Sequence, residues 1–269
     1  MTGAGTQDNP YIIETWTDLF DCAQSSDNCG RLANDLDGND YNGGIMPLRS
    51  KFPSYLDGAG HTIRNIYNIT GSPSSSYNIF EPVGGEIKNL TFENVITDVP
   101  FITAYGSRIL TFENCKFSVS AYHLMTGGAT LKECTISCDL IAGFTPTGSA
   151  FILERCDLKA KIKSPRNSPL FSTCKSCRIE AELQSHISNF SSSHVMSVSN
   201  SVLAIKPHPD ETASLRITGD AMLPSVLDSD LWGSAPKGNV GDGIIFLSTQ
   251  DMKNADALNA AGFQVVRVS

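Results

Sequence analysis

The stretch Cys134-Thr-Ile-Ser-Cys-Asp-Leu140 places apolar side chains at every second position. The same alternation returns as Cys156-x-Leu158-x-Ala160-x-Ile162 and as Cys177-x-Ile179-x-Ala181-x-Leu183. Alternation of this kind is typical of a β-strand that buries one face and exposes the other. The sequence therefore contains one strand that recurs with changes.

Further copies of this strand lie on both sides. Their first inward residues are predicted to be Ile66, Leu90, Cys115, Cys134, Cys156, Cys177, Ser201 and Ser229, at intervals of 24, 25, 19, 22, 21, 24 and 28 residues. A second series of large side chains precedes the copies, at Phe80, Phe101, Leu124, Phe144, Phe171 and Phe190. Repeats of about 20 to 50 residues indicate a solenoid. Each repeat, called a coil below, is expected to contain at least two strands and a Gly or Ser corner.

A strand with one apolar face cannot bury that face alone, so identical coils stack and close a common core. Stacked strands lie about 4.8 Å apart, so roughly nine coils form a rod. We therefore predict an all-β fold, a single-stranded right-handed parallel β-helix. A β-sandwich is the alternative, but it needs hairpin signals between strands. The Asn-Gly pair at Asn42-Gly43 lies outside the repeats.

The predicted solenoid, residues 31–235, is flanked by two caps. Residues 1–30 hold a short strand and a helix that begins after Thr15, because Thr15 and Asp18 form a capping-box pattern. Residues 236–269 read as a strand-helix-strand cap, with a strand at 243–248, a helix at 249–261 and a strand at 263–268. Caps of this kind cover the apolar ends of a solenoid.

The formal net charge of −8 argues against a nucleic-acid backbone or an anionic membrane surface as partner, because both require a basic face. No apolar run is long enough to span a bilayer. The first residues do not read as a secretory signal. We therefore expect a protein that is made in the cytoplasm and released by lysis.

Five cysteines, Cys115, Cys134, Cys138, Cys156 and Cys177, occupy inward strand positions, where a thiol behaves as a small apolar group. Free, stacked thiols are the favoured interpretation. Cys174 and Cys177 have the CxxC spacing of a zinc site, but no second pair or histidine accompanies them. We expect no metal and no cofactor. Cys22 and Cys29 flank a short loop and could pair under oxidation or remain free.

The opening of the chain carries a resemblance. Gly5-Thr-x-x-Asn-Pro-Tyr-x-Ile13, followed by Leu56-Asp-Gly-x-Gly-His-Thr-Ile-Arg-Asn-Ile66, looks like the first coils of pectate-lyase-like right-handed parallel β-helix proteins. Among these, the chain most resembles non-enzymatic tail and surface proteins of bacteriophages and prophages. The resemblance implies a virion component that attaches to a host surface or to its neighbours, and it implies a homotrimer.

Catalytic motifs of the same fold match poorly. His61 lies in Gly-His-Thr, whereas glycosidases of this fold have Gly-His-Gly, and no Asp-Asp pair occurs. Glycoside hydrolysis requires two carboxyl groups across one bond, and no convincing pair can be nominated. Asp35, Asp37 and Asp40 form the best acidic cluster, which is better explained as a solvated turn than as a calcium site. The sequence thus favours a non-enzymatic role, although the enzyme question stays open.

Binding by an outer face is the remaining possibility, because a solenoid offers long surfaces for a saccharide or a protein. The candidate residues are Tyr105, Tyr122, His123, Asn189, Phe190 and Trp232. Phe190 and Trp232 are more readily explained as core residues. Three functions compete: a virion attachment or assembly protein that binds itself, other virion proteins or a host saccharide; a polysaccharide depolymerase; and a fragment of a bacterial surface adhesin.

Overall fold

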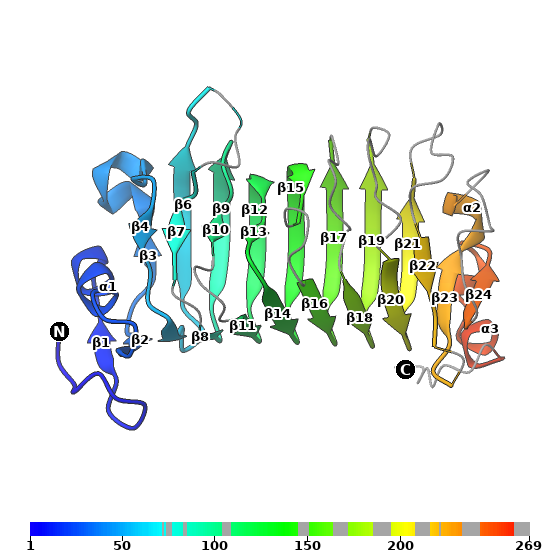
Figure 1. The fold of residues 1–269 in the computed structure, drawn as a ribbon, viewed down its shortest axis with the longest axis horizontal. Helices are drawn as coiled ribbons and strands as arrows, with labels where there is room; N and C mark the ends of the chain where they lie inside the picture. The colour runs from blue at the N-terminus through cyan, green and yellow to red at the C-terminus, as the bar shows by residue number, and fades with distance from the viewer. Residues whose placement is uncertain are drawn as a thin grey trace.

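The computed structural model describes residues 1–71, 73, 77–82, 85–103, 109–144, 151–163, 172–184, 195–207, 216–220, 222–232 and 243–260. Across these residues the chain winds into a rod of stacked parallel strands, with β1 near one end of the rod and β24 near the other (Figure 1). Two sheets of ten strands and one of four are formed by the described part. The predicted all-β parallel solenoid is confirmed.

Each coil contributes one strand to each long sheet. Sheet A contains β1 (Tyr11–Ile13), β2 (Cys29–Leu32), β5 (Tyr55–Asp57), β8 (Gly85–Lys88), β11 (Leu110–Glu113), β14 (Ala129–Lys132), β16 (Phe151–Glu154), β18 (Thr173–Lys175), β20 (Val195–Ser199) and β22 (Arg216–Thr218). Sheet B contains β3 (Leu36–Asp37), β6 (Thr62–Asn68), β9 (Thr91–Thr97), β12 (Lys116–His123), β15 (Thr135–Gly143), β17 (Asp157–Ile162), β19 (Arg178–Leu183), β21 (Val202–Lys206), β23 (Ser225–Asp228) and β24 (Ile244–Leu247).

A third, short sheet lines one side of the first half of the rod. It contains β4 (Ser50–Lys51), β7 (Phe80–Glu81), β10 (Ile102–Thr103) and β13 (Met125–Thr126). The second predicted series of large side chains lies at or next to this sheet. Four of its members are completely buried: Phe80, Phe101, Leu124 and Phe144. Phe171 and Phe190 lie outside the described residues.

In-register stacking explains the core. Phe112 pairs with Leu131, which pairs with Leu153, so one apolar side chain lies over the next. All three are completely buried. Parallel backbone hydrogen bonds join each strand to the next along the rod, and the inward-facing half of the alternating side chains fills its interior. One large apolar core therefore runs from Ile13 to Trp232, and a second, small cluster around Val226 and Leu258 lies beside it at the C-terminal end.

The corner between sheets A and B is made by a residue with positive φ. Asn89, Asn114, Glu133, Arg155, Ser176 and Asn200 occupy this position with φ between 46° and 55°. Asparagine tolerates the left-handed region better than most residues. The Asn114 amide also donates to Asn89 Oδ1 at 2.9 Å, so successive corners are joined. This corner is additional to the expected Gly or Ser corner.

The predicted cysteine column follows directly after this corner. Cys115, Cys134, Cys156 and Cys177 are all buried, and the column continues as Ser201 and Ser225. Two predicted members were wrong. Ile66 pairs with Val95 and not with Leu90, because β6 and β9 each carry a positive-φ residue in mid-strand, and Ser229 begins a helix.

Short helices lie near both ends of the described rod. Helix α1 (Trp16–Cys22) begins with the predicted capping box, and the Trp16 indole donates to the Asp37 carbonyl at 2.8 Å. Near the other end lie α2 (Ser229–Trp232), a 3-10 turn at Asp251–Lys253 and α3 (Ala255–Ala260). The single helix predicted at 249–261 was wrong, because Asn254 is extended and separates the two.

The predicted strand at 263–268 lies outside the described residues. Sheet B already extends to β24, which pairs with β23 in parallel. No helix among the described residues is both long and apolar enough to cross a membrane.

Candidate functional site

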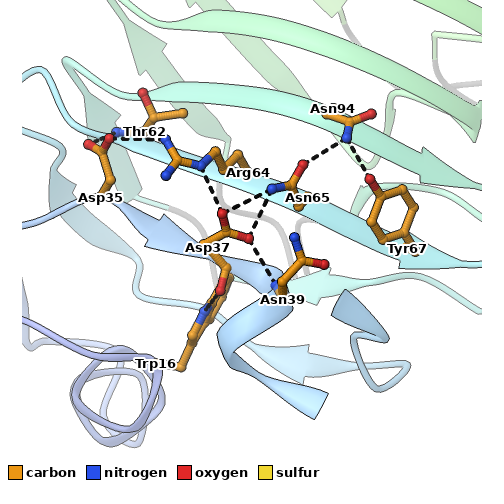
Figure 2. A network of polar contacts seen from close by, with 9 residues as sticks. All are labelled: Trp16, Asp35, Asp37, Asn39, Thr62, Arg64, Asn65, Tyr67 and Asn94. Carbon is orange, nitrogen blue, oxygen red and sulfur yellow. Dashed lines mark hydrogen bonds and ion pairs between the residues drawn. The ribbon is translucent and has the colours of Figure 1, made fainter. Parts of the chain in front are cut away.

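A network of polar side chains on the outer face of sheet B joins the first coils (Figure 2). At its centre, Asp37 accepts hydrogen bonds from Arg64 Nε at 3.0 Å and from the Asn65 amide at 2.9 and 3.0 Å. It also accepts from the Asn39 backbone N–H at 3.0 Å. These donors, the Asn65 amide first, lower the pKa of Asp37 to about 2. The carboxylate is therefore held in its ionised form.

Asp35 has the same role at the start of the network. Its Oδ1 accepts from the Thr62 backbone N–H at 3.0 Å and lies 3.2 Å from His61 Nδ1, while Oδ2 lies 3.4 Å from Arg64 Nη1. The Thr62 N–H contributes most to lowering the pKa of Asp35, followed by His61. Asp35 and its His61 and Arg64 partners are each more than a third exposed, so water screens these contacts.

Asparagine side chains continue the network along the rod, from one coil to the next. Asn65 and Asn94 occupy equivalent mid-strand positions with φ of 56° and 51°. The Asn94 amide donates to Asn65 Oδ1 at 2.7 Å and to the Tyr67 hydroxyl. Arg64, Asn65 and Asn94 therefore tie β3, β6 and β9 together on the outer face (Figure 2).

The acidic cluster of the first coils is thus a set of acceptors for donors of the chain itself. Asp35 and Asp37 face N–H groups from the next coil, and Asp40 lies exposed in the adjoining turn. Among the described residues, no three His, Cys, Asp or Glu side chains gather as a metal site would require. The expected solvated turn is only part of the explanation, because both carboxylates bridge two coils.

An open groove of about 580 Å³ lies on the outer face of sheet A at the same end of the rod. Its floor is made by outward residues of β2, β5 and β8, and its rim by the N-terminal loop and the loop after α1. Tyr55 on β5 is in register with Cys29 on β2 and with Glu86 on β8, and it is 37% exposed. The groove is lined by Gln7, Asp8, Pro10, Asp27, Cys29, Gly30, Arg31, Tyr55, Leu56, Asp57, Glu86 and Lys88.

The rim is fixed by backbone hydrogen bonds. The Cys29 N–H donates to the Gly5 carbonyl at 2.9 Å, and the Ile12 N–H donates to the Thr2 carbonyl at 2.8 Å. Thr6 and Asn9 exchange backbone bonds of 3.2 Å within the loop. The first ten residues therefore fold back on β1 and β2, and this places Gln7 and Asp8 beside the floor.

The groove carries more negative than positive groups. Its lining holds four carboxylates, from Asp8, Asp27, Asp57 and Glu86, against the two cations Arg31 and Lys88. Asp57 Oδ1 accepts from the Ala59 N–H and from the Asn89 amide, each at 2.9 Å. Its Oδ2 has no hydrogen-bond partner in the described part of the chain. Glu86 lies 3.8 Å from Lys88 and is 46% exposed, so its contact is loose.

A second, shallower hollow of about 360 Å³ lies over the middle of sheet B. Its floor is formed by serines on neighbouring strands, Ser118 and Ser137, which pair in register. It is lined by Asn94, Val95, Ile96, Ser118, Val119, Ser120, Ser137, Cys138, Asp139, Lys159, Ala160 and Lys161. Tyr67 pairs with Ile96 at its border, but no aromatic ring lines it.

Three of the six predicted binding residues lie in the described part. Tyr122 is half-buried, and its ring centre lies 4.9 Å from that of His123. His123 is 4% exposed, its Nδ1 lies 3.0 Å from the Gly143 carbonyl, and burial lowers its pKa. Trp232 is 2% exposed on α2, which fits its core interpretation. A binding role for Tyr122 stays a prediction, and Tyr105, Asn189 and Phe190 lie outside the described residues.

The groove contains residues that the sequence did not single out. Tyr55 and Asp57 alternate with buried Leu56, so their outward direction was legible from the strand pattern. Nothing in the local pattern shows that residues 7–10 fold over them. All eight cysteines carry free thiols, and seven are buried. The half-buried one, Cys29, lies in this groove.

Comparison with known proteins gives little further information. No protein-family model matches the chain, and no curated protein matches it. A solved structure that is similar to this chain is a protein from Bacteroides ovatus, provisionally described as an immunoglobulin A1 protease. The two are 15% identical with a TM-score of 0.47, over 96% of this chain and 89% of the other. Likeness at that level carries no argument about function.

Proposed function

We propose that the protein is a non-enzymatic component of a bacteriophage or prophage particle, part of the tail or baseplate. In this role it attaches the particle to a host surface or joins neighbouring particle proteins. Support comes from the opening residues Gly5 to Ile13 and Leu56 to Ile66, which resemble such proteins. The proposed location is the virion, and the proposed partners are further copies of the chain, as a homotrimer, other virion proteins and a host saccharide.

The observation that carries the non-enzymatic part is the use made of the acidic cluster. Asp35 is the carboxylate beside His61, the residue that suggests glycosidase chemistry, and Asp37 lies beyond it in the same network. A glycosidase needs one carboxyl group as acid and another as base or nucleophile, both facing the substrate. Here both carboxylates accept bonds from the next coil, and the donors lower the pKa of each. Such groups serve as anchors and make poor general acids.

A rigid rod with a polar groove suits attachment. The stacked core continues through the described coils, so the outer faces keep a fixed shape. The groove of sheet A offers one exposed aromatic ring among hydrogen-bonding side chains. Apolar surface combined with a few placed polar groups is the usual composition of a small-ligand site. We take this groove as the surface that contacts a host saccharide.

Three measurements on one preparation test the proposal. Light scattering is expected to give a mass of three chains of 28.9 kDa each. The labelled protein is expected to bind whole bacterial cells and to release no reducing sugar from their surface polysaccharides. Sugar release that disappears when a carboxylate is changed to its amide would overturn the non-enzymatic role. Failure to bind any cell or particle protein would overturn attachment and assembly together.

A polysaccharide depolymerase is the second candidate, and the groove supplies its supporting observation. Asp57 and Glu86 lie on the neighbouring strands β5 and β8, and Asp57 Oδ2 is unbonded in the described part. Two carboxyl groups beside a saccharide are the minimum for cleavage. This candidate predicts that Asp57→Asn and Glu86→Gln each abolish sugar release while cell binding persists.

A further inference from the structure

The groove on sheet A combines three features that bear on the chemistry of its ligand. It has an exposed aromatic ring at the centre of its floor, a fixed polar rim and an excess of carboxylates. Each feature restricts the class of molecule that fits. The ligand class inferred for this groove rests on the proposed attachment role and belongs to that same site.

The aromatic floor favours a ring with an apolar face. Tyr55 points outward from β5, flanked in register by Cys29 on β2 and by Glu86 on β8. Cys29 has a smaller side chain than Glu86, and it lines the groove beside Tyr55. The C–H groups on one face of a pyranose ring form a flat apolar surface that packs on an aromatic ring. Tyrosine adds a hydroxyl group at the end of that surface.

The charges favour a cation over an anion. Four carboxylates line the groove against two basic groups, and within the described part of the chain neither basic group forms a tight ion pair. An acidic saccharide would meet repulsion from Asp8, Asp27 and Glu86. A protonated amine would instead meet attraction from them, and a cation close to a tyrosine ring is attracted by the ring face as well.

Asp57 gives the amine a specific acceptor. Its Oδ1 is fixed by the Ala59 N–H and the Asn89 amide, which orient the carboxylate. Its Oδ2 is without a hydrogen-bond partner in the described residues and lies on the same outward face as Tyr55. An oriented carboxylate with one free oxygen accepts a charge-assisted hydrogen bond without further ordering cost.

We propose that this groove binds a saccharide that carries a free amino group, with the sugar ring packed on Tyr55 and the ammonium group facing the carboxylates. Asp57 Oδ2 and Glu86 accept from the ammonium group, and Gln7 and Arg31 reach the sugar hydroxyls from the rim and floor. The ligand class is thus an amino sugar that is not N-acylated, as part of a surface glycan.

Cys29 provides a direct readout for occupancy. It is the half-buried cysteine of the eight, and it lies beside Tyr55 in the groove. An aromatic disulfide reagent is therefore expected to modify about one thiol per native chain. Glucosamine oligomers are the probe, and N-acetylglucosamine oligomers of equal length are the matched control. We expect the amine form to slow the Cys29 reaction at concentrations about tenfold lower than the N-acetyl form.

Variants of groove residues test whether the protection of Cys29 reflects binding in the groove. Tyr55→Ala is expected to weaken glucosamine-oligomer binding about tenfold, and Glu86→Gln is expected to weaken it severalfold. Calorimetry measures both. Tyr77→Ala is the control, because Tyr77 is 49% exposed and does not line the groove. Added salt is expected to weaken binding of the amine form. Equal affinity for amine and N-acetyl oligomers, equal affinity for a lysine tetrapeptide, or unchanged affinity in Tyr55→Ala overturns the proposal.

The experiments distinguish a wrong amino-sugar assignment from a wrong attachment role. If Tyr55→Ala still binds cells as the unmodified protein does, the groove is not the contact surface and the amino-sugar assignment falls, while attachment stands. If glucosamine oligomers protect Cys29 but the protein also cleaves surface polysaccharide, the ligand assignment stands and the non-enzymatic role falls.

Discussion

The first coils and the middle coils are held together in different ways. Between β3, β6 and β9, outer side chains make charge-assisted and amide hydrogen bonds from coil to coil. From β11 to β19 apolar residues and thiols stack in register in the interior, and the outer ion pairs between coils are exposed. The first coils are irregular, with positive-φ residues in mid-strand at Asn65 and Asn94. The polar bridges of these first coils form one connected network, whereas those of the later coils, such as Arg155 with Glu133 and Lys159 with Glu180, are separate exposed pairs.

This difference also locates the functional surface. A regular stack presents flat faces, because every coil repeats the last one. The irregular end has extra chain, the N-terminal loop and helix α1, folded against the first strands (Figure 1). Concave surface arises where such segments meet a sheet, and the larger groove lies there. The comparison predicts that stability depends mostly on the middle coils and ligand binding on the first.

The largest expected effect is in the core of the middle coils. Leu158 is completely buried and stacks between Ile136 and Ile179. Leu158→Ala is expected to lower the free energy of unfolding by about 2 to 5 kcal/mol, because a cavity remains among the neighbours. Urea unfolding followed by circular dichroism measures it. Ile96→Ala, at a 40% exposed position, should change little, and equal losses would contradict the comparison.

The second largest loss of stability is expected in the buried cysteine column. The Cys156 backbone N–H donates to Cys177 Sγ at 3.3 Å, and the Cys177 N–H donates to Ser201 Oγ at 3.1 Å. Cys177→Val leaves a buried N–H unpaired and is expected to cost about 1 to 3 kcal/mol. Cys177→Ser keeps an acceptor, as Ser201 and Ser225 do in the same column. A serine variant less stable than the valine variant would contradict this role.

The polar network of the first coils predicts a smaller effect that depends on pH. Asp37→Ala removes bonds to Asn39, Arg64 and Asn65, and is expected to cost about 1 to 2 kcal/mol near pH 7. The pKa of Asp37 falls from 3.8 to about 2 on folding. A lowered pKa contributes stability that is complete above pH 3.8 and is lost as the pH falls toward 2.

Denaturant curves of the unmodified protein and of Asp37→Asn, taken from about pH 6 to about pH 2.5, measure this loss. The stability difference between the two proteins is expected to shrink as the solution is acidified. The corresponding difference for Cys177→Val should stay constant over this range, because no carboxylate is involved. A constant difference for Asp37→Asn would show that its bonds do not need the ionised carboxylate.

An effect of similar size to that of Asp37→Ala is expected at the corner between sheets A and B. Asn114 has φ of 52° and donates to Asn89. Asn114→Ala is expected to cost about 1 to 2 kcal/mol, because a Cβ without a compensating local bond is unfavourable in the left-handed region. Asn114→Gly should cost less, since glycine adopts this conformation freely. Thermal unfolding compares the two variants, and a glycine variant that is less stable would reverse the assignment.

Much of the fold was predictable because its signals are local. The alternation at Cys134 to Leu140 gives a strand wherever it occurs, and the capping box at Thr15 and Asp18 requires only four residues. The predictions were wrong where they depended on the register between neighbouring coils. Ile66 was placed in the column of Leu90, but the pairing of Thr62 with Thr91 places Ile66 level with Val95. Ser229 was placed in a strand although Ser225 occupies that column.

The candidate site was less predictable for the same reason. Tyr55 and Asp57 were visible as outward residues, but the groove exists because the N-terminal loop lies over them through a bond from Cys29 to Gly5. Asp37 was visible as part of an acidic cluster, but its partners Arg64 and Asn65 are one coil away. Such contacts depend on the length and path of each coil.

The sequence by itself determined that this chain alternates buried and exposed residues, repeats them at solenoid intervals and closes its N-terminal end with a helix. These properties follow from side-chain periodicity and local hydrogen bonding, which act within a few residues. Only the tertiary structure decided which residues stack, that the acidic cluster bridges coils, and that Cys29, Tyr55 and Asp57 share a groove. Those outcomes arise from the register between coils, where one extra residue changes every neighbour above and below it.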